Sequence, residues 1–321
     1  AFYCSNMLVM ALELAAGDQA YGDMASKFFE HFIAITDAMN SFGGTGLWDE
    51  SDGFYYDQLS NQGSSIPLRV RSLVGLIPLL AVEILEEEAI ERLPGFSKRM
   101  RWFLDHRREL AQHISYRKNA EGKGLYLLSV PSKERLLKVV TCLLNEEEFL
   151  APHGVRSLSK IHASAPYVFY VGHTPYSVTY CPADSNTEFF GGNSNWRGPI
   201  WFPINYLLIE ALERYYHFYG DEFRVPCPAV SPEPITLKEA AQELARRLSA
   251  IFLPDADGRR ACHGDGARYS TDAEWRDLVL FYEYFNGDDG AGLGASHQTG
   301  WTALVARCIQ KSIESRRTTG S

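Results

Sequence analysis

Three segments of this sequence place acidic side chains beside aromatic rings, a combination suited to binding a neutral ligand rich in hydroxyl groups. The first segment, residues 46–57, reads GLWDESDGFYYD and has four acids and four aromatics around Asp52-Gly53, a dipeptide typical of a hairpin turn of type I′. Carboxylates accept hydrogen bonds from hydroxyls while rings cover apolar C–H faces. The candidate ligand-binding residues are Trp48, Asp49, Tyr55 and Asp57. The alternative is a solvated hairpin with packed rings.

The second segment, residues 191–203, reads GGNSNWRGPIWFP and leads from a Gly/Asn-rich loop into an apolar stretch. Pro199 is suited to the first turn of a helix, so the loop is expected at a helix N-terminus, where backbone N–H groups are free. Trp196 and Trp201 flank the turn, and Arg197 can make bidentate hydrogen bonds. The alternative is that both tryptophans simply fill the core.

The third segment, residues 281–301, reads FYEYFNGDDGAGLGASHQTGW. Glu283 stands among four aromatic residues, a setting that disfavours the charged form of a carboxyl group or limits its access to water. His297 and Gln298 precede the last expected helix and can present side chains to the same cavity. Glu283 could instead be a structural hydrogen-bond acceptor. The glycines lack the strand-then-helix context of a nucleotide-binding loop, so phosphate binding is disfavoured.

Composition narrows the class of protein further. With 321 residues, 45% hydrophobic and 22% charged, the chain has a folded core, and its net charge of −9 argues against a nucleic-acid partner. No G-x-S-x-G, HExxH or CxxC motif occurs, so neither a metal nor another cofactor is expected. Six scattered cysteines favour a reducing compartment, which we take to be the cytoplasm. The most apolar stretch, residues 73–85, is too short to span a membrane and predicts a buried helix.

Helical periodicity recurs along the chain and predicts an all-α class. Thr236 and Glu239 form a capping box before an apolar face, and the last helix is expected from Trp301 to Ile313. A β-hairpin is expected at residues 167–180, and strands do not alternate with helices as in an α/β sheet. The apolar stripes are Phe28, Phe32, Ile35 and Met39; Leu136, Val139, Val140 and Leu143; Ile204, Leu207, Leu208, Ala211, Tyr215 and Phe218; and Leu237, Ala241, Leu244, Leu248 and Ile251.

The three segments in this order resemble the catalytic domain of glycoside hydrolase family 63, which includes processing α-glucosidase I and mannosylglycerate hydrolases. This resemblance implies an (α/α)6 toroid, a barrel of two helical rings with hairpins in its loops. Met7, Leu8, Ala11, Leu12 and Ala15 already follow helical spacing at the start of the chain. We therefore expect residues 1–316 to be the C-terminal two-thirds of a single such domain in a larger protein, and residues 317–321 to be a flexible tail.

The resemblance also implies roles for single residues. Glu283 corresponds to the family's general base, Trp196 and Trp201 to the wall of the sugar subsite, and Gln298 to a ligand of sugar hydroxyls. The family's general acid, an aspartate, has no matching motif here, so it is expected upstream in the parent chain. The implied activity is inverting hydrolysis of an α-glucoside or α-mannoside without a cofactor, with no nucleic-acid or membrane partner. This chain alone is expected to be inactive.

A different class of function also remains open at this stage. A non-catalytic carbohydrate-binding or structural helical module could use the same tryptophans without chemistry. The general acid of the parent chain distinguishes the two, because a purely structural module would lack it.

Overall fold

The computed structural model describes residues 1–41, 44, 46–61, 64–119, 121–185 and 196–319. The chain divides into two compact units. Unit 1 comprises Ala1–Leu68, Val74–Val139 and Arg214–Phe223, and unit 2 comprises Arg69–Leu73, Val140–Glu213 and Arg224–Ser321. Within the described ranges, no helix is both long and apolar enough to cross a membrane.

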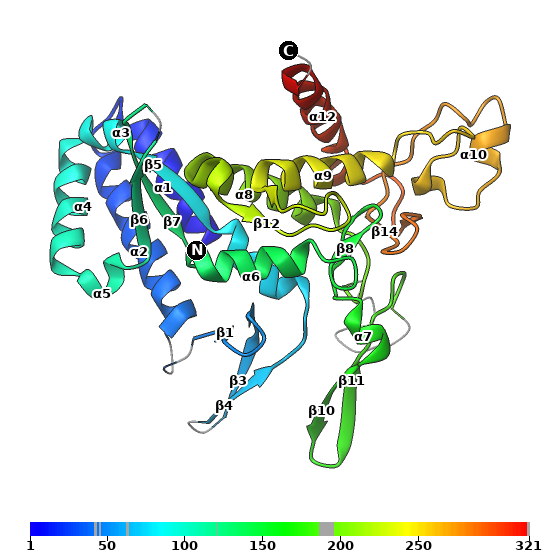
Figure 1. The fold of residues 1–321 in the computed structure, drawn as a ribbon, viewed down its shortest axis with the longest axis horizontal. Coiled ribbons are helices and arrows are strands. Elements are labelled where there is room, and N and C mark those ends of the chain that lie inside the picture. The colour runs from blue at the N-terminus through cyan, green and yellow to red at the C-terminus, as the bar shows by residue number, and fades with distance from the viewer. Residues whose placement is uncertain (42–43, 45, 62–63, 120, 186–195, 320–321) are drawn as a thin grey trace. The chain divides into compact units, whose positions relative to one another are not determined.

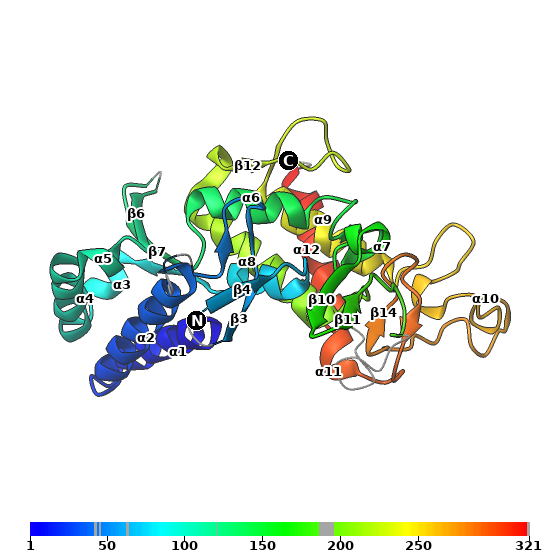
Figure 2. The ribbon, with the colours of Figure 1, turned by 90° about the horizontal axis from the view of Figure 1, so that it is seen from below.

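The helices of unit 1 pack around α2 (Tyr21–Ser41), which lies beside α1 (Phe2–Ala15) in Figures 1 and 2. Phe29 of α2 meets Phe96 and Phe103 edge-on, with ring centroids 6.0 and 5.3 Å apart. The predicted helix is confirmed, but its buried face is shifted: Phe29 and Ile33 are buried and Phe28 is only half-buried. The other helices are α3 (Glu87–Glu91), α4 (Pro94–His106) and α5 (Arg108–Ala111).

A three-stranded antiparallel sheet completes unit 1, with β7 (Gly124–Ser129) between β5 (Val82–Glu86) and β6 (Ile114–Lys118). The prediction of a buried helix at residues 73–85 is wrong. The 3₁₀ helix η2 (Leu73–Leu80) contains Pro78, and the chain then enters β5. Because proline cannot donate a helical hydrogen bond, the helix ends near it and the β-branched residues beyond it pair with β7.

The predicted all-α class, with its (α/α)6 toroid, is wrong for this chain, because the described residues contain one three-stranded and six two-stranded antiparallel sheets. Four of the two-stranded sheets have strands of only two residues, which a search for helical periodicity does not detect. The expected hairpin at residues 167–180 is confirmed. The two-stranded sheets are β1 (Trp48–Asp49) with β2 (Phe54–Tyr55), β3 (Asp57–Asn61) with β4 (Ser64–Leu68), β8 (Leu150–Ala151) with β9 (Gly154–Val155), β10 (Tyr167–Val171) with β11 (Thr174–Val178), β12 (Arg224–Val225) with β13 (Ile235–Thr236), and β14 (Tyr284–Phe285) with β15 (Gly292–Leu293).

Most of the remaining helices belong to unit 2, and two of them, α6 (Lys133–Leu143) and α8 (Phe202–Tyr219), contribute residues to both units. The capping box of α9 (Leu237–Ala250) is confirmed: Glu239 N donates to Thr236 Oγ1 at 3.2 Å, and Thr236 N donates to Glu239 Oε2 at 2.7 Å. The predicted last helix is interrupted, with α11 (Thr299–Thr302) preceding α12 (Val305–Thr319), which packs against α9. The short elements are α7 (Ile161–Ser164), η3 (Gly220–Glu222), η4 (Ala261–His263) and α10 (Arg268–Thr271).

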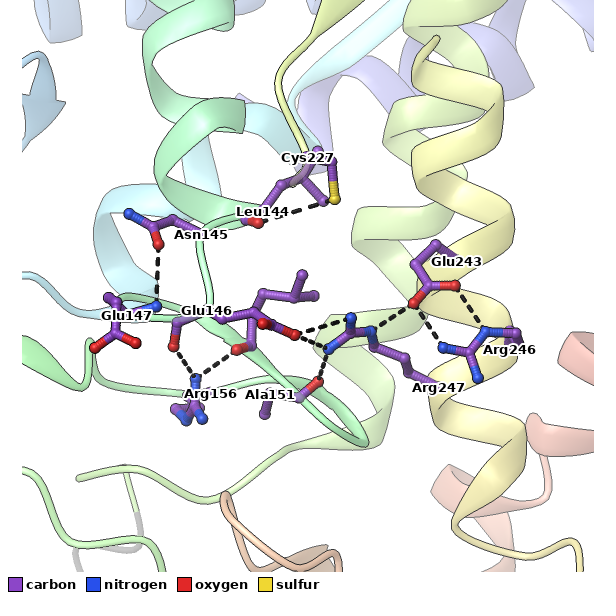
Figure 3. Close-up of polar contacts among 11 residues, drawn as sticks. Leu144, Asn145, Glu146, Glu147, Ala151, Arg156, Cys227, Glu243, Arg246 and Arg247 are labelled. Carbon is purple, nitrogen blue, oxygen red and sulfur yellow. Dashed lines mark hydrogen bonds and ion pairs between the residues drawn. The ribbon is translucent and has the colours of Figure 1, made fainter. Parts of the chain in front are cut away.

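A buried arginine ties α9 to the loop before β8, as Figure 3 shows. Arg247 donates from Nε to Glu243 at 2.7 Å, from Nη1 to the carbonyl of Ala151 at 2.7 Å, and from both terminal nitrogens to Glu146 at 3.1 Å. Burial raises the pKa of Glu243, but hydrogen bonds from Arg246 and Arg247 outweigh it and hold the pKa below its usual value. These bonds fix the segment that leads to β9, which lies next to the candidate site.

Candidate functional site

The second and third motifs are joined by backbone hydrogen bonds within unit 2. Ile200 N donates to Phe285 O at 2.7 Å, and Phe285 N donates to Ile200 O at 3.0 Å. On the other side, Ser157 N donates to Pro199 O at 3.0 Å. The chain around Ile200 therefore lies between two strand-like segments, and Trp201 of one motif stacks on Tyr284, the residue after Glu283, of the other. Residues 191–195 of the second motif lie outside the described residues.

Two glycines allow these segments to cross closely. A Cβ on Gly287 would lie 2.5 Å from Gly198 O, and a Cβ on Gly198 would collide with the backbone of Cys181. Gly287 N also donates to Pro182 O at 2.8 Å, and Cys181 N donates to Arg197 O at 2.7 Å. These glycines serve as crossing points of the backbone, a role that loop composition alone did not reveal.

An aromatic stack runs from the surface of unit 2 into its core. Trp196 lies parallel to Trp201 with ring centroids 4.2 Å apart and an interplanar angle of 5°. Trp201 in turn stacks on Tyr284 at 4.9 Å, and Trp301 lies tilted against it at 5.8 Å. Trp196 is 44% exposed whereas Trp201 and Tyr284 are buried, so among these three rings only the outermost is exposed. We name Trp196, Trp201 and Tyr284 the aromatic stack.

Glu283 directly precedes the innermost ring of this stack. Its side chain is half-buried, and its Oε2 accepts a hydrogen bond from Ala295 N at 3.3 Å. A carboxylate held by a backbone N–H, next in sequence to a ring of the aromatic stack, is the kind of group that can accept a proton from a bound water. The hydroxyl of Tyr284 donates to Asp184, an exposed carboxylate that the sequence did not single out. Neither Asp184 nor its neighbours Pro182 and Ala183 belong to a recognisable sequence motif.

Arg197 is buried beside the crossing, and its burial lowers the pKa of its guanidinium. Gly198 N, the next backbone donor, bonds to Ser157 Oγ at 3.1 Å. The side chain of Arg197 is therefore buried within unit 2. Its expected contact with a sugar stays a prediction.

The glycine-rich run after Glu283 forms a tight turn between β14 and β15. Asn286 Oδ1 accepts from Asp288 N at 2.8 Å, and Gly290 N donates to Asn286 O at 3.0 Å. Asp288 is held from outside the turn by Tyr180, whose hydroxyl donates to it at 2.7 Å. Burial raises the pKa of Tyr180 above its usual range. The glycine-rich run is thus the loop of a β-hairpin that is supported from outside by Tyr180.

His297 and Gln298 lie where the chain returns alongside the start of the third motif. Gln298 N donates to Phe281 O at 2.7 Å, and Gln298 O accepts from Trp301 N at 3.0 Å to begin α11. His297 is exposed and Gln298 is half-buried. Their backbone positions place them in the same motif as Glu283, and their contacts with a ligand stay predictions.

The first motif belongs to unit 1, and there the residues have local roles. Trp48 and Tyr55 are buried and meet edge-on at 4.9 Å, and burial raises the pKa of Tyr55 to about 12. Asp49 Oδ1 accepts from Ser51 N at 2.9 Å and so closes the turn. Asp57 is exposed on β3. The hairpin is confirmed, but residues 50–53 make a four-residue turn instead of the expected two-residue type I′ turn.

Nothing in the described part of the chain gathers three or more His, Cys, Asp or Glu side chains that could hold a metal ion.

Comparison with known proteins adds a family. Residues 87–302 match the family model described as "Mannosylglycerate hydrolase MGH1-like glycoside hydrolase domain". This range includes the second and third motifs and leaves out the first.

Individual relatives come from two yeasts. An uncharacterized protein of Saccharomyces cerevisiae is 48% identical over 326 residues, which covers 96% of this chain and 30% of that protein. Mannosyl-oligosaccharide glucosidase of the same organism is 28% identical over 54% of this chain and 15% of its own length. A probable mannosyl-oligosaccharide glucosidase of Schizosaccharomyces pombe is 24% identical over 56% of this chain and 16% of its own length. The chain thus spans less than a third of each of these relatives.

Proposed function

Because this chain belongs to the mannosylglycerate hydrolase MGH1-like glycoside hydrolase family, we propose that it supplies the general base of an inverting α-glycosidase. The resemblance of its motifs to glycoside hydrolase family 63 is confirmed at the level of the family. The observation that carries the proposal is the position of Glu283, held by Ala295 N and adjacent in sequence to the inner ring of the aromatic stack. This chemistry needs a carboxylate that activates water on one face of the sugar. An aromatic ring nearby can bind the sugar through its apolar C–H groups.

In the proposed reaction, Glu283 removes a proton from water as the water oxygen attacks the anomeric carbon of the sugar. The bond to the leaving oxygen breaks on the opposite face, and a general acid protonates that oxygen. Inverting enzymes keep the two carboxyl groups roughly 6.5–9.5 Å apart, which leaves room for the water. We assign the acid to another part of the parent protein. An α-linked substrate then yields a product whose new hydroxyl is β.

The substrate we propose is an α-glucoside or an α-mannoside. The names of two relatives describe glucosidases of mannosyl-oligosaccharides, and the family model is named after a mannosylglycerate hydrolase. The exposed face of Trp196 would cover the apolar face of the sugar ring. We propose Arg197, His297 and Gln298 as hydroxyl ligands; the sugar contacts expected of Trp48, Asp49, Tyr55 and Asp57, which belong to unit 1, stay predictions. The free cysteines support a reducing, cytoplasmic location.

The test uses the full-length parent protein with α-glucosyl fluoride and α-mannosyl fluoride as substrates. Proton NMR of the first product reports the anomer, and β-product is expected. Glu283→Gln should lower turnover by roughly 10²–10⁴-fold, as expected for loss of a general base, while the melting temperature stays near that of the wild type. Glu233→Gln, the same change on an exposed surface loop, is the control. A fully active Glu283→Gln enzyme would refute the assignment.

The same experiment separates catalysis from a non-catalytic carbohydrate-binding module. Such a module would bind sugars through the aromatic stack with no turnover by the full-length protein. The 321-residue chain alone is expected to be inactive because we assign the acid to another part of the parent protein. If the isolated chain hydrolysed either fluoride and required a carboxylate of the first motif, Asp49, Asp52 and Asp57 would become the candidates for the acid.

A further inference from the structure

We propose that the backbone of Gly294 and Ala295 positions the Glu283 carboxylate, so that Gly294 is a positioning residue for the base. This inference rests on the proposed role of Glu283 and deepens it. The two residues follow β15 directly, where the chain turns back past the start of β14. The base is therefore held by backbone atoms, whose positions are fixed by the pairing of β14 with β15.

The Glu283 carboxylate is held by a backbone donor. Its Oε2 accepts from Ala295 N at 3.3 Å, and no other hydrogen bond to this carboxylate is found among the described residues. Within the described ranges the other oxygen of the carboxylate accepts no hydrogen bond, and we propose that a water binds there. The single donor also makes the orientation of the carboxylate sensitive to any movement of residues 294–295.

The space around Gly294 is too small for a side chain. A Cβ at this position would lie 2.7 Å from Glu283 Oε2, 3.0 Å from Glu283 Cβ and 2.8 Å from Cε1 of Tyr284. Gly294 also has φ +71°, in the left-handed region that L side chains rarely adopt. A methyl group here would displace both the Glu283 carboxylate and the ring of Tyr284, because both lie closer than 3.0 Å to the added atom.

The sequence offers a matched control for the backbone strain. Gly258 has φ +76°, and a Cβ added to it would meet no atom within 4 Å. Gly258→Ala thus introduces the same unfavourable backbone conformation in unit 2 without touching Glu283. Any difference between the two alanine variants reports the contacts of the added methyl group with Glu283 and with the ring of Tyr284, and variants without the carboxylate separate the two.

The experiment measures turnover of α-glucosyl fluoride by the full-length protein, with single variants and a double-mutant cycle. Gly294→Ala should lower kcat roughly 100-fold, the effect expected when a reacting group is displaced by about 1 Å, and Gly258→Ala should leave it unchanged. In a Glu283→Ala background, azide replaces water as a nucleophile that needs no base. It attacks the anomeric carbon as fluoride leaves, and gives the β-glycosyl azide. In that background, adding Gly294→Ala should change the azide-dependent rate less than about twofold.

The outcomes separate this inference from the proposed function. Full activity of Glu283→Gln overturns the function itself. If that variant is impaired but Gly294→Ala matches Gly258→Ala, the function stands and the positioning role is overturned. An equal loss from Gly294→Ala with and without the carboxylate also overturns it, because the damage is then general.

If Gly294→Ala proves too unstable to assay, thermal melts give the same information. Removing the carboxylate with Glu283→Ala should then recover part of the melting temperature lost in Gly294→Ala. An unchanged loss would overturn the positioning role.

Discussion

The buried network of Arg247 allows a quantitative prediction from two neighbouring arginines on one helix. Arg246 and Arg247 both bind Glu243, but the side chain of Arg247 is 6% exposed and that of Arg246 is 60% exposed. Replacing Arg247 with methionine keeps much of the aliphatic stem and removes the charge. Replacing Arg246 in the same way gives the matched control. Comparing the two variants tests whether the buried arginine contributes more to the free energy of unfolding than the exposed one.

The expected cost follows from the partners that each arginine leaves behind. Without Arg247, the carbonyl of Ala151 loses a buried donor at 2.7 Å, which costs about 1–3 kcal/mol. Glu243 still accepts hydrogen bonds from Arg246 on both oxygens. The cost of losing the hydrogen bond between Arg247 and Glu243 is therefore near the lower end of about 1.5–3 kcal/mol for a hydrogen bond to a charged group. Glu146 is more than half exposed and contributes at most about 1 kcal/mol. We expect a total of about 4 kcal/mol for Arg247→Met and at most about 1 kcal/mol for Arg246→Met.

Hydrogen–deuterium exchange in the full-length protein measures this cost locally. Peptides covering α9 should exchange roughly 1,000-fold faster in Arg247→Met than in the wild type, because 1.4 kcal/mol corresponds to about a factor of 10. Arg246→Met should accelerate the same peptides by about fivefold at most. Equal acceleration in the two variants would refute the reasoning, since it would mean that the buried contacts add nothing beyond the pair with Glu243.

Three further predictions concern single side chains. Thr236→Ala should remove about 1 kcal/mol and lower the melting temperature by about 2–4 °C, and Thr236→Ser should restore it; no change would contradict a working capping box. Glu243 has a lowered pKa when folded, so its stabilisation is complete above its usual value of 4.5 and lost as the pH falls through the folded pKa; the gap in melting temperature between wild type and Arg247→Met should therefore narrow below pH 4.5. Trp196→Ala should raise KM about tenfold with little change in kcat, and an unchanged KM for both fluorides would argue against the sugar face.

Local signals in the sequence predicted local structure well. The capping box located the start of α9, and all four apolar residues of the stripe in α6 are fully buried. In α2 the helix was predicted but the buried face was not, because Phe28 and Phe29 are both apolar and only their neighbours decide which one faces the core. The three-stranded sheet was missed because β5 finds its partner β7 about forty residues later, and no local pattern encodes that pairing.

In the candidate site, too, the sequence predicted individual residues but not the long-range contacts that support them. Residue types were enough to single out Glu283 and both tryptophans, and a family resemblance assigned them roles. The support for those residues comes from elsewhere: Ser157 lies beside Pro199, and Asp184 accepts from Tyr284. These contacts join segments far apart in the sequence, so only the folded chain reveals them.

The crossing of Gly198 and Gly287 has a consequence for how this protein tolerates substitution. Both positions are buried in loops, where most proteins accept change readily. Here even a methyl group would push two backbones apart, and with them the segments that carry Trp201 and Tyr284. In a saturation mutagenesis scored by activity, these two loop positions should therefore be among the least tolerant in unit 2, as intolerant as residues that contact the substrate.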